Sequence, residues 1–181
     1  MRMQAKTLTG IALLLLGLSG RAQAGPGDTP LPTFSDGKPA QALYYAIGVI
    51  KNNNLETDFV CTNVDGVPVD IGVEVFDEIG VRRNAVGAVP DNGVGLNMLP
   101  GRTLTVGTGG TAILHEDRLI TMDLAGTGVQ ALRNGSARIV ATSANVFCTA
   151  MLLDQLHLIQ DPALSAAPPP AMVSIPLVRI P

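Results

Sequence analysis

The sequence predicts an all-β fold, a two-sheet antiparallel β-sandwich of about nine strands. Two observations support this prediction. Short apolar or alternating runs recur between turn residues, and glycine and proline contribute 20 and 13 of the 181 residues. Beyond the first segment, no run of about ten residues has convincing helical periodicity, residues 151–159 being the best short candidate. A closed barrel would show the same strand pattern and stays open as an alternative.

The clearest single strand is expected at residues 67–76. Valine or isoleucine occupies every odd position from 69 to 75, while Asp70, Gly72 and Glu74 alternate with them. This pattern is typical of an antiparallel strand with one buried and one solvated face. A turn is expected at 77–80 and a loop at 87–101. The other strands are expected at 43–50, 57–63, 81–86, 103–106, 118–124, 136–143, 145–153 and 172–180.

The composition divides the chain into one folded domain and flanking segments. Residues 25–41 are crowded with proline, glycine, aspartate and serine, so we expect an extended leader outside the core. The β-sandwich domain is expected at 42–160. A proline-rich spacer at 161–171 leads to a terminal strand at 172–181, which Pro176 confines to a sheet edge.

Residues 1–24 have the three parts of a secretory signal peptide. Arg2 and Lys6 precede a short apolar run, and Ala22-Gln23-Ala24 supplies the small residues of a cleavage site before Gly25. The apolar run has about 11 residues, well below the roughly 20 that a membrane-spanning helix needs. We therefore expect an exported protein, periplasmic or extracellular after cleavage, whose mature form has no membrane span.

Charge argues against nucleic acid as a partner. The formal net charge is −3, and cleavage after Ala24 would remove three basic residues and no acidic ones. The mature chain then has no basic cluster beyond Arg82-Arg83. Nucleic-acid binding needs several phosphate-neutralising residues on one face and is disfavoured.

The chain has two cysteines, Cys61 and Cys148. Both lie in short β-branched and aromatic runs, which predicts that both belong to core strands. In an oxidising compartment they most simply form one disulfide. Two buried free thiols or a reactive cysteine are the alternatives, although neither site has a nearby histidine or lysine to lower a thiol pKa.

Several motifs resemble the immunoglobulin-like β-sandwich modules of exported bacterial proteins. They occur, in order, as Cys61-Thr62-Asn63, the strand 68–76 with Asp77 and Gly80 after it, Leu99-Pro100-Gly101 with Thr103, and residues 135–143. The resemblance covers about residues 43–153. It implies a sandwich fold and a structural or interaction role, and it carries no catalytic motif.

Residues 107–112 match the glycine-rich pattern of dinucleotide-binding proteins. That function requires a preceding strand, a following helix and an acidic residue further on, in a βαβ unit. The surrounding chain has no such rhythm, so a loop connecting strands is the expected structure.

Few polar residues are candidates for a metal or acid–base site. His115, Glu116 and Asp117 are adjacent, and neighbours on a strand point to opposite faces, so an exposed polar turn is expected there. His157 is the one other histidine. The densest acidic set lacks calcium-loop spacing and is expected to be solvated, namely Asp65, Asp70, Asp77 and Glu78. No catalytic, metal or cofactor-binding residue is therefore predicted.

The function that these features favour is non-enzymatic. We expect a structural, adhesion or protein-interaction component of the cell envelope. Its expected partner is a protein, either a second copy of the chain, through strand exchange at 172–180, or another envelope component. The alternative is a small-ligand or glycan-binding module that uses the loops 87–101 and 107–117.

Overall fold

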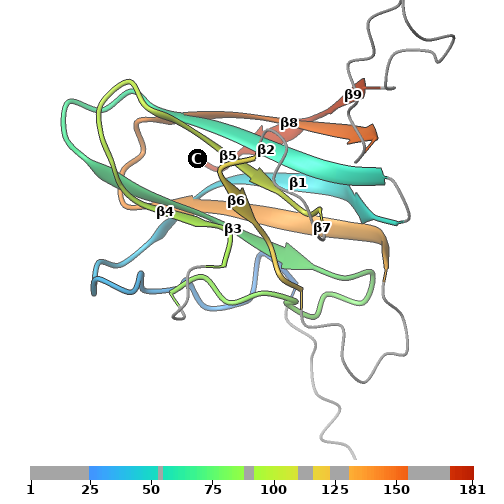
Figure 1. Cartoon of the computed structure of the whole chain (residues 1–181). Coiled ribbons are helices and arrows are strands. Elements are labelled where there is room, and N and C mark those ends of the chain that lie inside the picture. Colours follow the sequence, from blue (N-terminus) through green and yellow to red (C-terminus); the bar gives the residue numbers. More distant parts are fainter. Residues whose placement is uncertain (1–24, 53–54, 88–91, 110–115, 123–130, 155–171) are drawn as a thin grey trace, which may run out of the picture.

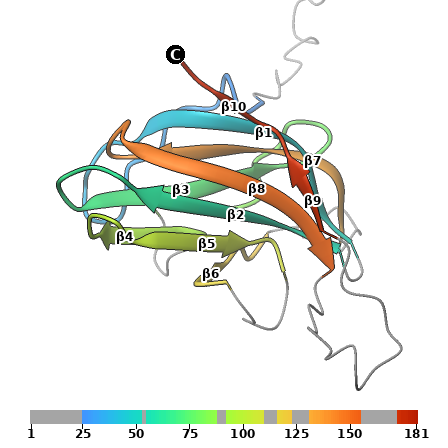
Figure 2. The same ribbon diagram turned by 90° about the horizontal axis from the view of Figure 1, so that it is seen from above.

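The computed structural model is all-β, and ten strands in its described part form two five-stranded sheets that pack face to face (Figures 1 and 2). The predicted all-β, two-sheet sandwich is confirmed. The described residues are 25–52, 55–87, 92–109, 116–122, 131–154 and 172–181. The predicted signal peptide, with Ala24, and the proline-rich spacer at 161–171 lie outside them, whereas Gly25 is the first described residue.

The two sheets are nearly all antiparallel. The first sheet has the order β10 (Leu177–Arg179), β1 (Gln41–Lys51), β7 (Leu132–Ala141), β3 (Val69–Phe76) and β4 (Val94–Met98). The second has the order β6 (Arg118–Leu119), β5 (Thr103–Gly107), β2 (Leu55–Asn63), β8 (Val146–Asp154) and β9 (Met172–Ile175). The pair β5 and β6 is parallel.

Two connections carry the chain from the first sheet to the second. The chain passes from β1 in the first sheet to β2 in the second, and again from β7 to β8. Because β1 is antiparallel to β7 and β2 is antiparallel to β8, these two crossings lie at opposite ends of the strands, after Lys51 and after Ala141. Residues far apart in sequence thus meet in both layers.

The core lies between the inner faces of the sheets. Residues of alternating position contribute to it, as period-two strands require. Phe59 of β2, Val73 of β3 and Ile139 of β7 are all fully buried in one cluster. The Tyr44 hydroxyl crosses the interior and donates a hydrogen bond of 2.9 Å to the carbonyl of Val146.

Strand β3 is buried on both faces, so the prediction of a half-buried strand is wrong. Its outer face, formed by Asp70, Gly72 and Glu74, is covered by other parts of the chain. Asp70 accepts a 2.8 Å bond from Lys38. A Cβ atom on Gly72 would lie 2.9 Å from a Val86 methyl group, so only glycine leaves room for that side chain.

The covering segment is residues 25–40, which we call the strap. It runs along the outside of the first sheet (blue in Figure 1). Phe34 and Ala40 are buried in a second apolar cluster with Val86 and Val140. The expectation that this leader stays outside the core is therefore wrong for Phe34 and Ala40, because the outer face of β3 offers them an apolar floor.

Arg138 of β7 holds the strap and Glu74 together. Its guanidinium donates to Glu74 Oε2 at 2.6 and 2.8 Å. It also donates to the carbonyls of Pro26, Thr29 and Pro30 at 2.8, 2.7 and 3.1 Å. The side chains of Arg138 and Glu74 are 2% and 0% exposed, so this ion pair is shielded from water.

Residues 81–86 do not form the predicted strand, and Asn84 shows why. Its amide accepts a 2.7 Å bond from the Val75 N–H and donates a 2.8 Å bond to the Val73 carbonyl. A side chain thus makes the contacts that a paired strand backbone would make. The backbone pairs only as an isolated bridge between Phe76 and Arg82.

Two other strand predictions need correction. The predicted loop 87–101 contains strand β4, which pairs with β3. The predicted strand 118–124 is confined, in its described part, to the two residues of β6, after which Ile120 donates to the Gly107 carbonyl. The predicted terminal strand lies at the sheet edges as expected, but it is divided at Pro176 into β9 and β10, one in each sheet.

The predicted disulfide between Cys61 and Cys148 is present. The two residues are directly opposite each other on β2 and β8, within the second sheet. The bridge spans a sequence separation of 87 residues. It therefore ties an early strand to a late one and leaves the two sheets to be held together by core packing.

No helix in the described residues has both the length and the apolar character of a membrane span.

Replacement of Arg138 by methionine should lower the free energy of unfolding by about 3 kcal/mol, because it leaves Glu74 buried with fewer charged partners. Arg82 still donates to Glu74 Oε1 at 2.9 Å, which limits the loss. Urea denaturation followed by circular dichroism measures the change. Arg133→Met, at an exposed position of the same strand, is the control, and equal stability of the two variants would contradict the assigned role.

The Cys61→Ala/Cys148→Ala double variant should be less stable by about 2–4 kcal/mol, since the cross-link restricts the unfolded chain. Chemical denaturation of the variant and of the oxidised wild type gives the difference. Peptide mapping without reductant must also recover the two cysteines in one cross-linked species. Free thiols at both positions in the protein isolated without reductant would refute the pairing.

Candidate functional site

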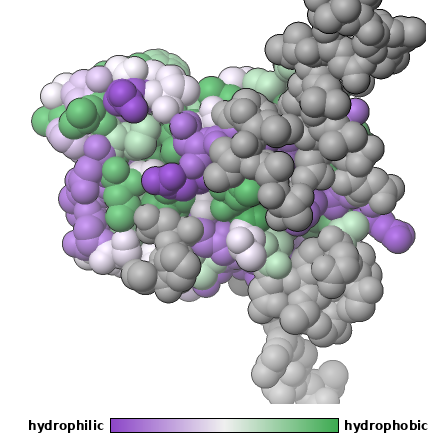
Figure 3. Space-filling model, in the orientation of Figure 1, coloured by the Kyte–Doolittle hydropathy of each residue, from purple (hydrophilic) through white to green (hydrophobic). Residues whose placement is uncertain are grey.

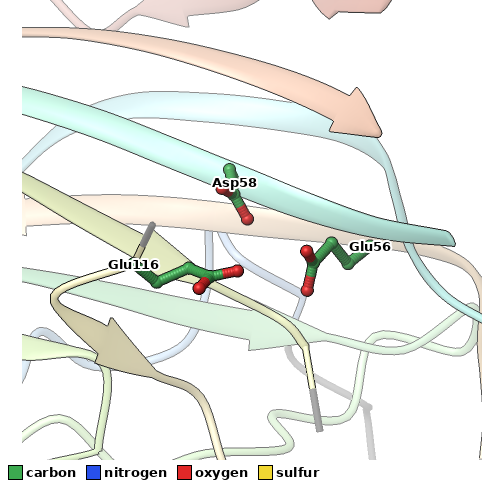
Figure 4. Close-up of side chains that lie close together, drawn as sticks. All are labelled: Glu56, Asp58 and Glu116. Carbon is green, nitrogen blue, oxygen red and sulfur yellow. The ribbon is translucent and has the colours of Figure 1, made fainter. Parts of the chain in front are cut away.

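Three buried acidic side chains lie together beside β2 and β5. Glu56 and Asp58 are two positions apart on β2, so they point to the same face of the strand. Glu116 approaches from the segment that precedes β6 (Figure 4). One oxygen of each residue lies within 4.8 Å of one oxygen of the others. The three residues, which we call the acidic cluster, are 1%, 0% and 3% exposed.

The backbone of β5 positions the acidic cluster. Asp58 pairs with Gly107 in the register of β2 and β5. Residues 117–119 then run beside β5 in the parallel direction, and the Asp117 N–H donates to the Thr105 carbonyl at 2.9 Å. This path places Glu116 over Gly107 rather than in an exposed turn.

Glycine in the 107–112 run is needed for space. A Cβ atom on Gly107 would lie 2.7 Å from Glu116 Cγ and 2.9 Å from Asp58 Oδ1. A Cβ atom on Gly109 would overlap Glu56 Oε2. In the described part of this run, glycine thus lets carboxyl groups approach the backbone, a different role from phosphate binding.

The acidic cluster favours a neutral Glu56. Burial raises the pKa of Glu56 to about 8, and the negative charges of Asp58 and Glu116 and a hydrogen bond with Glu116 add to the shift. Lys51 opposes it through its positive charge. Burial in turn lowers the pKa of Lys51, and the charge of Glu56 acts in the opposite direction. At neutral pH the cluster therefore retains a proton that an exposed glutamate would have lost.

The chemistry open to the acidic cluster is narrow. Carboxylate oxygens are ligands for Ca²⁺ and Mg²⁺, and the three residues are the set in the described chain that could hold a metal ion. Ca²⁺ takes about six to eight oxygens, and these three carboxyl groups reach only the lower limit even when each binds through both oxygens. The hydrogen bond between Glu56 and Glu116 requires no metal ion, because a proton shared by the two carboxyl groups is sufficient.

The structure corrects the expectation of an exposed turn at Glu116, whereas Asp117 is exposed as expected. Glu116 is buried in the acidic cluster and not in an exposed turn. Asp117 accepts a 2.8 Å bond from the Thr105 N–H, beside the cluster. His115 and His157 lie outside the described residues.

The other acidic residues that the sequence singled out are not brought together in the described chain. Asp65 accepts hydrogen bonds from Ser143 and Asn145, which hold the pKa of Asp65 below its usual range. Asp70 binds Lys38, and Asp77 pairs with Arg83. Glu78 is exposed, as expected, whereas Asp70 and Asp77 are buried and the expectation that they are solvated is wrong.

The acidic cluster had a weak signal in the sequence. Glu56 and Asp58 have strand spacing, but the predicted strand began at residue 57 and left Glu56 outside it. A strand starting at residue 55 places both acids on one face next to the glycine-rich run. Nothing in the local sequence shows that Glu116 joins them, because this contact depends on the path of the chain after β5.

The loops of the ligand-binding alternative are partly strand. Residues 94–98 form β4, and residues 99–102 form a turn in which Arg102 N–H donates to the Leu99 carbonyl at 3.0 Å. Residues 88–91 and 110–115 lie outside the described chain.

The chain was compared with known proteins in three ways, and no family model, curated protein or solved structure matches it.

The stability of the protein should fall as pH rises between about 4.5 and about 8. The folded state retains the Glu56 proton over this interval while the unfolded state releases it, so the free energy of unfolding decreases, by at most about 1.4 kcal/mol per pH unit. Urea denaturation at a series of pH values, with chelator present, measures the slope.

Glu56→Gln mimics the protonated side chain and should flatten this slope and make the protein more stable than the wild type at pH 8. Glu78→Gln, at an exposed acid, is the matched control and should keep the wild-type slope. An unchanged slope in Glu56→Gln would show that Glu56 does not hold the proton.

Proposed function

We propose that the protein is an exported, non-enzymatic β-sandwich that acts through protein contacts as a structural or adhesion component of the cell envelope. The burial of the acidic cluster supports a structural rather than a catalytic role for its three residues, because carboxyl groups that are at most 3% exposed do not meet a substrate in solution. The immunoglobulin-like resemblance of the motifs agrees with this role but does not identify a partner.

One surface feature carries the proposal. Four large apolar side chains are 49–60% exposed at one end of the sandwich, where β2 ends, β3 and β8 begin, and β4 turns into β5. We call this surface the apolar end. Figure 3 shows hydrophobic atoms at this end, on the left of the molecule. Its members are Val64, Val67, Leu99 and Phe147.

Asn63 fixes the loops that present the apolar end. It is fully buried, and its amide donates to the carbonyls of Val67 and Met98 at 2.9 and 2.8 Å. Its backbone carbonyl accepts a 2.8 Å bond from Gly101. Both turns are therefore held by one side chain before any partner arrives, which reduces the entropy lost on binding.

Charges of both signs stand beside the apolar end. Asp65 lies in the same turn as Val64 and Val67, and its hydrogen bond from Ser143 holds its pKa below the usual range. Arg102, in the same turn as Leu99, is exposed and supplies a positive charge. The two signs offset each other, so this end has no excess of positive charge to attract anionic lipid. Apolar groups beside a few polar ones are the usual composition of a protein interface.

Charged substitutions at the apolar end should abolish partner binding. Val67→Asp and Leu99→Asp should each reduce cross-linked capture of envelope proteins by the full mature chain at least about tenfold, since a buried charge in an interface costs more than 1.4 kcal/mol. Ile79→Asp is the control, because Ile79 is 56% exposed in a different turn.

Equal capture by the three variants would refute the proposal, as would binding to anionic vesicles that needs Val67 and Leu99. Circular dichroism and thermal melts establish that all three variants remain folded.

A further inference from the structure

The last described segment, residues 172–180, belongs to both sheets. β9 pairs with β8 through four residue pairs, and β10 pairs with β1 through three. Pro176 separates the two strands and has no N–H to donate, so it falls at the point where the chain leaves one sheet for the other. Figure 2 shows this segment (red) passing across the side of the sandwich. We call it the closing segment.

Few side chains of the closing segment are buried. Met172, Val173 and Val178 are 61–63% exposed. Ile175 and Leu177, on either side of Pro176, are the two that pack partly against the main core. The segment is thus held chiefly by strand pairing, with two apolar side chains as anchors.

The remaining contacts of the closing segment are typical of a strand that is added to the edge of a sheet. Arg179 donates to the Ala144 carbonyl at 2.9 Å and lies over the rings of Tyr44 and Phe147. The Ile180 N–H donates to the Leu43 carbonyl at 2.8 Å. All of these contacts are non-covalent, and the same segment from another copy would make them equally well.

The connection to β8 is much longer than its geometry requires. Leu153 and Met172 are register partners in β8 and β9. A hairpin between such neighbours needs about two to five residues, whereas residues 155–171 separate these strands. The connection includes Pro168-Pro169-Pro170, and consecutive prolines favour an extended polyproline conformation of about 3.1 Å per residue over a tight return. At about 3.1 Å per residue, a connection of this length is long enough to reach a neighbouring molecule.

We propose that the closing segment is exchanged between copies of this chain, each copy donating residues 172–180 to β1 and β8 of the other. The exchange preserves every strand pair of the sandwich and removes the need for the connection to fold back on itself. Its strand pairs lie on the side of the sandwich that carries β8 and β1, and it meets the apolar end at Phe147, over which Arg179 lies. The capture assay of the apolar end uses Val67 and Leu99 instead, so either proposal can hold without the other.

Cysteines placed on separate copies test the exchange. Met151 and Ser174 are register partners on β8 and β9. Full-length chains carrying Met151→Cys or Ser174→Cys, with tags of different size, are expressed together and exported. Exchange brings the two new thiols face to face between chains, so non-reducing electrophoresis should show a heterodimer that reductant dissolves.

The matched control pairs Ser174→Cys with Thr103→Cys, an exposed position on β5 that β2 and β8 separate from β9. We expect at least about tenfold more heterodimer from the test pair than from this control. A single chain with both Met151→Cys and Ser174→Cys reports whether the register itself is correct. Internal cross-linking of that chain, with no excess of heterodimer over the control, would overturn the exchange. That result would say nothing about the apolar end, which the capture assay tests separately.

Discussion

The buried pair of Arg138 and Glu74 is the interaction on which the first sheet depends. The two residues are register partners on β7 and β3, and both side chains leave the sheet on its outer face. Two charges without water require hydrogen bonds in nearly every direction that their donors and acceptors point. Arg138 meets this demand with one carboxylate oxygen and three strap carbonyls, and Arg82 reaches the other oxygen of Glu74. The strap is therefore part of the solvation of the ion pair.

This requirement explains the layer outside the first sheet. Once the strap start is fixed by Arg138, Phe34 lies over Gly72 and Lys38 reaches Asp70 at the far end of β3. Along β3 the outer residues thus alternate as anion, gap and anion. The strap meets Asp70 and Gly72 directly, through Lys38 and Phe34, and it meets Glu74 through Arg138. An all-apolar outer face would bury the same area but would not fix where the strap begins and ends.

The same strand shows what the sequence could and could not predict. The aliphatic period of two identified the strand and its inner face, because that pattern depends only on local backbone geometry. It could not distinguish polar residues that face water from polar residues that face buried partners, since Arg138 lies more than sixty positions away. For the same reason the sequence pattern predicted that Asn84 belongs to a strand and that Glu116 belongs to an exposed turn. The disulfide was predictable because two cysteines allow a single intramolecular pairing and the signal-like first segment predicts an oxidising compartment.

Strand β2 runs from the acidic cluster at its beginning to the apolar end at its other end, and its length separates the two sites. Glu56 and Asp58 lie near its beginning, and Asn63 ends it. At about 3.4 Å per residue, Glu56 and Asn63 are separated by more than 20 Å along a strand that pairs with β8 over its whole length. The acidic cluster retains its proton through interactions confined to the first end, while the exposed apolar side chains depend on Asn63 at the other. A change of protonation at Glu56 therefore alters the stability of the fold without moving the loops of the apolar end, unless the whole of β2 unfolds.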